Sequence, residues 1–128
     1  MQSIAIMASL LMFLNVTLLM ILVPGGPIEN RDFKHLKGVV FWGFNLFLII
    51  LGIASFIVCY LLLVSHSYAV LTGQILAGLY FIVYMIDLAG VFPKSPTKMS
   101  RTLMLIEIIN ISMAVFLFLV LTAMDRVL

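Results

Sequence analysis

Four long apolar stretches, separated by short polar or turn-forming segments, dominate the chain. Each reaches the roughly 20 residues that a helix needs to cross the hydrocarbon core of a bilayer. Backbone inside lipid must satisfy its own hydrogen bonds, which a helix achieves within one segment. The pattern therefore predicts an all-α integral membrane protein, a four-transmembrane-helix bundle that forms a single domain over residues 1–128. The helices are predicted at residues 3–23, 39–64, 68–91 and 102–122.

Turn-forming residues mark the ends of these stretches. The Pro-Gly-Gly-Pro run at residues 24–27 ends the first one, because proline removes a backbone donor and glycine permits a chain reversal. His66 and Ser67 form a tight link between the second and third stretches. Ser100 is predicted as the N-cap of the last helix.

The amino-acid composition also indicates a membrane protein, with lipid as the main solvent of the chain. Hydrophobic residues make up 65% of it and charged residues only 9%, whereas a soluble domain has roughly 25% charged residues. The net charge of +2 is spread over loops, so the chain lacks the continuous basic face of a nucleic-acid-binding protein. Cys59 is the only cysteine, which excludes an intramolecular disulfide or a CxxC pair and favours a packing role.

Basic residues predict the orientation of the bundle. Six of the seven Lys and Arg residues lie at residues 24–38 and 92–101, two loops that share one side of a four-helix protein. The positive-inside rule assigns these loops to the cytoplasm and both termini to the outside. We expect the plasma (inner) membrane as the location. No Lys or Arg precedes the first stretch, so we expect it to be a retained helix and not a signal peptide.

Two carboxylates inside the predicted helices are the most informative feature of the chain. Asp87 falls in the third helix and Glu107 in the fourth, both towards the predicted cytoplasmic side. An ionisable group in hydrocarbon costs a few kcal/mol or more, so it is usually paired, turned inward or functional. Lys94, Lys98 and Arg101 are near enough in sequence to offer a structural ion pair instead.

Other polar residues lie at similar depths in the predicted helices, so each helix offers one or more of them to a common layer. Helical spacing groups several on single faces. On the second helix, Asn45 shares its face with Trp42 and Ile49. The candidate ligand-binding or proton-coupling residues are Asp87, Glu107, Asn110, Asn45, Tyr84, Tyr80 and Asn15.

The first loop is a second candidate site, because it concentrates charge beside a glycine-rich turn. No metal site is expected there, since its one histidine lacks a second histidine or cysteine at ligand spacing. No cofactor is expected, and no Walker, GxSxG or HExxH motif occurs in the chain. These absences favour a non-enzymatic role. The loop candidates are Glu29, Asn30, Arg31, Asp32 and His35.

The leading hypothesis from the sequence is a binding or interaction module, or an accessory subunit, with a polar layer in the cytoplasmic half of the bundle. It would work in the lipid bilayer as a homo-oligomer or in a larger membrane complex, and a lipid or small molecule is a candidate ligand. The first alternative is a proton- or cation-coupled transporter or channel that uses Asp87 and Glu107. The second alternative is an intramembrane lipid-modifying enzyme in which these two carboxylates divide the acid and base roles.

Overall fold

The computed structural model describes residues 2–22, 38–64, 66–92 and 98–127. In these ranges the chain is all-helical, with four α-helices and no β-strand. Each helix is long and apolar enough to span a membrane, as the hydrophobic pattern predicts. The helices are α1 (Gln2–Leu22), α2 (Gly38–Leu63), α3 (Ala69–Leu88) and α4 (Arg101–Val127).

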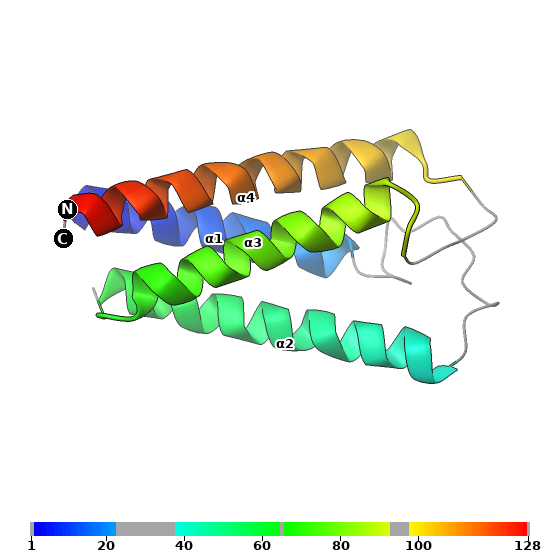
Figure 1. The fold of residues 1–128 in the computed structure, drawn as a ribbon, viewed down its shortest axis with the longest axis horizontal. Helices are drawn as coiled ribbons and strands as arrows, with labels where there is room; N and C mark the ends of the chain where they lie inside the picture. Colours follow the sequence, from blue (N-terminus) through cyan, green and yellow to red (C-terminus); the bar gives the residue numbers. More distant parts are fainter. Residues whose placement is uncertain (1, 23–37, 65, 93–97, 128) are drawn as a thin grey trace.

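The helices form an up-and-down bundle in which α1 packs on α2, α2 on α3, α3 on α4, and α4 on α1 (Figure 1). The start of α1, the turn from α2 to α3 and the finish of α4 lie together at what we call the turn end. The opposite end, where α1 and α3 finish and α2 and α4 begin, is called the acidic end. Asp87 and Glu107 both lie in the half of the bundle nearer the acidic end.

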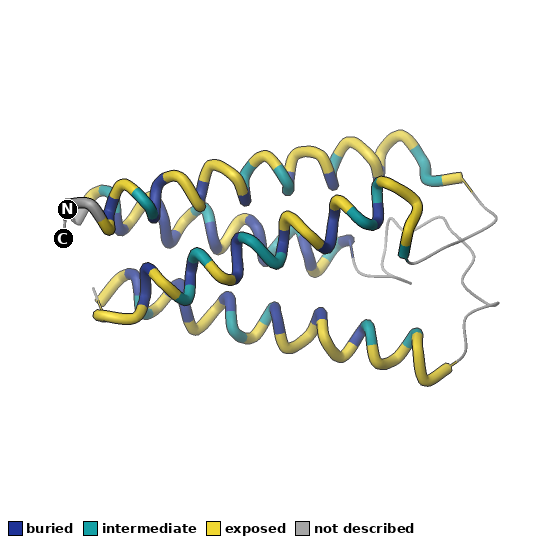
Figure 2. The backbone as a smooth tube through the Cα atoms, viewed as in Figure 1, coloured by how far each residue is buried: buried dark blue, intermediate teal, exposed yellow. Residues whose placement is uncertain are grey.

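Burial alternates around every helix, with one face inside the bundle and the other on its surface (Figure 2). The outer faces carry large apolar side chains, such as Leu10, Ile53 and Leu119, each more than half exposed. Soluble proteins rarely leave continuous apolar surface of this kind in contact with water. The surface is the kind that lipid covers, and a multi-pass membrane protein is the class that these four helices indicate.

Helix α3 finishes three residues earlier than the sequence predicts, because Gly90 ends it. Gly90 has φ 74°, a left-handed conformation that glycine adopts without strain. Its N–H donates to the carbonyl of Asp87 at 3.1 Å, and the Val91 N–H donates to the carbonyl of Ile86 at 2.9 Å. This pair of bonds is the Schellman pattern of a helix C-terminus. Asp87 therefore lies in the last turn of α3.

Helix α4 has the start that the sequence predicts and a later finish. The Leu103 N–H donates to Ser100 Oγ at 3.1 Å, which confirms Ser100 as the N-cap. The helix runs on to Val127 instead of stopping at residue 122. Met124 explains the extra turn, because its side chain is buried in the core, 5% exposed.

Small residues allow close packing along two seams. Between α1 and α2, Ser9 Oγ donates to the carbonyl of Cys59 at 3.0 Å. Between α3 and α4, a Cβ added to Gly73 would lie 2.8 Å from Cδ1 of Leu121. A larger residue at this position would force the Leu121 side chain to shift, so the α3–α4 seam is closely packed at the turn end.

Candidate functional site

Two acidic side chains border one small cavity near the acidic end. Asp87 projects from the last turn of α3 and is 8% exposed, and Glu107 projects from the second turn of α4 and is fully buried. We call this space the acidic cavity. All four helices line it, through Leu19, Leu22, Phe44, Leu48, Val83, Tyr84, Asp87 and Glu107.

The acidic cavity has a volume of about 10 Å³. A cavity needs about 10–15 Å³ on this measure to hold one water molecule, so the space is the size of a single water. Any larger ligand requires the helices to move apart. The titratable side chains that line the cavity with Glu107 are Asp87 and Tyr84 of α3, whereas the lining residues of α1 and α2 are apolar.

Tyr84 connects the carboxylates to two buried amides. Its hydroxyl lies within electrostatic range of Glu107 and Asp87 and next to the amide of Asn110, without a well-formed hydrogen bond. Asn110 Nδ2 donates to the backbone carbonyl of Asn15 on α1 at 3.4 Å. Both asparagines are fully buried and Tyr84 is 3% exposed. The polar residues of α1, α3 and α4 are thus neighbours in the interior.

Tyr80 extends this polar group towards the middle of the bundle. Its ring is stacked on that of Tyr84, with centroids 6.3 Å apart. Its hydroxyl lies 2.7 Å from Ser55 Oγ on α2, and Ser55 Oγ also donates to the carbonyl of Leu51 at 2.7 Å. Ser55 is not among the candidate residues from the sequence, because nothing in its local sequence reveals a partner on α3.

Six of the seven predicted residues thus lie in one connected region, and Asn45 does not. Asn45 is buried on α2, 9% exposed, but it does not line the acidic cavity. Trp42 and Ile49, which share its helix face by spacing, are 69% and 56% exposed, so only part of that face is turned into the bundle. Glu29, Asn30, Arg31, Asp32 and His35 lie outside the described residues.

Two basic side chains of the described segments lie near this region in sequence. Lys98 and Arg101 are exposed near the start of α4, and Lys94 lies outside the described residues. Within the described segments, no three His, Cys, Asp or Glu side chains are grouped in a way that could hold a metal ion. The described site is therefore a carboxylate pair with hydroxyl and amide neighbours.

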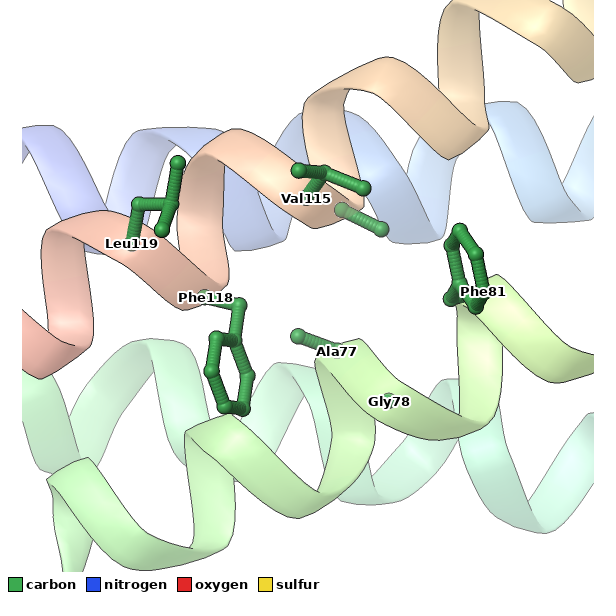
Figure 3. A pocket seen from close by; sticks show the side chains of 7 residues that line it. Ala77, Gly78, Phe81, Val115, Phe118 and Leu119 are labelled. Carbon is green, nitrogen blue, oxygen red and sulfur yellow. The ribbon is translucent and has the colours of Figure 1, made fainter.

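A separate apolar groove lies on the outer surface between α3 and α4 (Figure 3). It has a volume of about 280 Å³ and no polar lining. Ala77 and Gly78 form its low floor, and Phe81 and Phe118 stand on either side. The groove faces the surface that lipid would cover and does not communicate with the acidic cavity through any shared residue.

Fold and site together define a class: a small four-helix protein with helices of membrane-spanning length and a buried acidic site at one end. Over residues 4–127 the chain matches the family described as "Domain of unknown function (DUF8051)", and it belongs to that family. No curated protein matches the chain. No solved structure matches it either.

Proposed function

We propose that this protein is a multi-pass membrane protein that takes up and moves protons or small cations through the acidic cavity. The observation that carries the proposal is that Asp87 and Glu107 border one cavity of about 10 Å³. Two acids that share a small enclosed space hold a proton or a cation between them more readily than either does alone. The water-sized volume favours such a cargo over a lipid head group or a drug-sized molecule, which needs several hundred Å³.

The orientation is part of the same proposal. The acidic end faces the cytoplasm of the plasma (inner) membrane, because residues 24–38 and 92–101 carry six of the seven Lys and Arg residues. Single cysteines in a Cys59→Ser background test this orientation in intact cells. A membrane-impermeant thiol reagent should label His66→Cys at the turn end and should leave Lys98→Cys unlabelled. The reverse labelling would show that the acidic end faces outward.

Proton movement can be measured with the purified protein in vesicles that contain a pH-sensitive dye. A pH gradient is applied, with potassium and valinomycin to prevent a build-up of charge. Wild type should carry protons faster than protein-free vesicles, and Glu107→Gln and Asp87→Asn should fall to the protein-free rate. The matched control is Asp125→Asn, because Asp125 is an exposed carboxylate at the turn end of the same bundle.

A sodium or potassium gradient, applied in parallel vesicles, separates the two kinds of cargo. Dye responses that depend on the metal cation would indicate a cation-coupled process, whereas responses to the pH gradient alone would indicate protons. The proposal would be contradicted if wild type, Glu107→Gln and protein-free vesicles gave equal rates of dye response under every gradient.

An interaction module or accessory subunit is the second candidate, and the apolar groove between α3 and α4 favours it. Small residues at a helix surface let another transmembrane helix approach closely. A Cβ at Gly78 would meet no atom within 4 Å, so the backbone has room for a side chain there, and Gly78→Leu is expected to extend into the groove. A membrane complex that assembles with wild type and Glu107→Gln but not with Gly78→Leu would favour this second function.

A further inference from the structure

Hydroxyl groups continue from the acidic cavity into the middle of the bundle. Tyr80, Tyr84 and Asp87 are spaced four and three residues apart on α3, so they share one helix face. The rise from Asp87 to Tyr80 is about 10 Å along the helix axis. Beyond Tyr80, the column crosses to α2, where Ser55 Oγ lies 2.7 Å from the Tyr80 hydroxyl.

Polar atoms beside this column lack well-formed hydrogen bonds. They are the Tyr84 hydroxyl and the side-chain oxygens of Asn15 and Asn110. An unsatisfied buried polar atom costs about 1–3 kcal/mol. A bridging water recovers nearly the enthalpy of a direct hydrogen bond. A water molecule bridging these three atoms would therefore be stabilised.

We infer that Tyr84, Tyr80 and Ser55 form a proton relay that leads from the carboxylates into the bundle, and that the cargo is the proton. The inference rests on the proposed function and selects between its two cargoes. A hydroxyl both accepts and donates a hydrogen bond, so a row of hydroxyls can pass a proton from one oxygen to the next. A hard cation such as Mg²⁺ or Ca²⁺ takes six or more oxygen ligands, which a cavity of about 10 Å³ does not hold.

Each transfer conserves protons and charge. The O–H bond of the protonated Glu107 carboxyl breaks, and a new O–H bond forms on a bridging water or on the Tyr84 oxygen. That oxygen releases its own proton to the next oxygen of the row, Tyr80 does the same, and Ser55 releases its proton to a water molecule that enters when the turn end opens. Every hydroxyl gains one proton and loses one, so the relay residues end uncharged and no further reactant is consumed.

Beyond Ser55 and the buried contact of Ser9 with Cys59, apolar side chains fill the interior at the turn end. We call this group the turn-end core, and each member is at most 7% exposed. A proton that reaches Ser55 therefore crosses to the far side only when the turn end opens. The turn-end core consists of Ala5, Leu62, Val70, Leu121 and Met124.

The vesicle assay tests the relay with changes that remove only a hydroxyl. Tyr80→Phe and Ser55→Ala should slow proton movement about 100-fold, the lower end of what a positioned proton-transfer group contributes. Tyr60→Phe is the matched control, since Tyr60 is 64% exposed on α2. Ser55→Thr keeps the hydroxyl that Ser55→Ala removes, so its rate of proton movement should be close to that of wild type. Transfer along hydroxyls should also slow in D₂O, which a structural role for Tyr80 would not produce.

The outcomes separate the relay from the proposed function. Wild-type rates in Tyr80→Phe and Ser55→Ala, together with a loss in Glu107→Gln, overturn the relay and leave the acidic site in place. Wild-type rates in Glu107→Gln as well overturn both. A rate that follows sodium or potassium instead of pH overturns the choice of the proton. Melting curves identify any variant that has lost its fold. If Tyr80→Phe or Ser55→Ala has lost its fold, Ser55→Thr decides, and its failure to recover proton movement counts against the relay.

Discussion

The two ends of the bundle are built from different interiors. At the acidic end, Asp87 and Glu107 border a water-sized cavity beside buried hydroxyl and amide groups. At the turn end, the turn-end core fills the space with apolar side chains, and Gly73 lets α3 approach Leu121 closely. Polar exceptions are the buried Ser9, whose Oγ donates to the carbonyl of Cys59, and Gln74, whose Nε2 lies 3.2 Å from Thr122 Oγ1 at the partly buried α3–α4 seam.

This difference indicates that the bundle separates stability from chemistry. Lipid is as apolar as a leucine side chain, so helices in a membrane are held together mainly by packing and interhelical hydrogen bonds. Close packing at the turn end supplies that attraction. It allows the acidic end to carry buried polar groups, which are costly in hydrocarbon and are retained where they serve a function.

The largest effect on stability is expected at the turn end. Leu121→Ala should lower the free energy of unfolding by about 2 kcal/mol, near the low end for buried leucines, because lipid removes the transfer contribution and leaves the lost packing. Leu119→Ala is the matched control two residues away, since Leu119 is 59% exposed. Unfolding in mixed micelles with increasing denaturing detergent measures both. Equal losses for the two variants would show that the turn end is not the packed core.

A smaller effect is expected at the acidic end. Glu107→Gln should change the free energy of unfolding by less than about 1 kcal/mol, because the amide keeps the shape of the side chain and has no charge to desolvate. The same unfolding series measures it beside Leu121→Ala. A loss of about 3–5 kcal/mol would instead mark Glu107 as half of a buried structural ion pair.

The sequence alone predicts much of this division between the ends. Hydropathy locates the four helices, and Ser100 is recognisable as a cap because serine in front of an apolar run is a common helix start. Asp87 and Glu107 stand out because charge inside a long apolar stretch is rare. The end of α3 was also signalled by Gly90, but an apolar stretch continues to Val91 and masks it.

Contacts between helices could not be predicted in the same way. They depend on how each helix is rotated about its axis, and a helix that is apolar on every side gives little periodicity to fix that rotation. Asn45 was grouped with Trp42 for this reason, although the two have opposite exposure. The Ser55–Tyr80 contact joins α2 to α3 and has no counterpart in local sequence.

The protonation of Glu107 is the measurement that tests the central claim most directly. Glu29 and Glu107 are the only glutamates, so a Glu29→Gln variant made by cell-free synthesis with ¹³C-carboxyl glutamate, with glutamine synthetase inhibited, carries the labelled carboxyl at Glu107 alone. Infrared spectra of this variant in lipid should show the labelled carboxyl change reversibly between its protonated and ionised forms as pH is varied, and Tyr84→Phe should alter the change. A labelled band that keeps one form at every pH at which the protein stays folded would contradict a proton-carrying role for the acidic cavity.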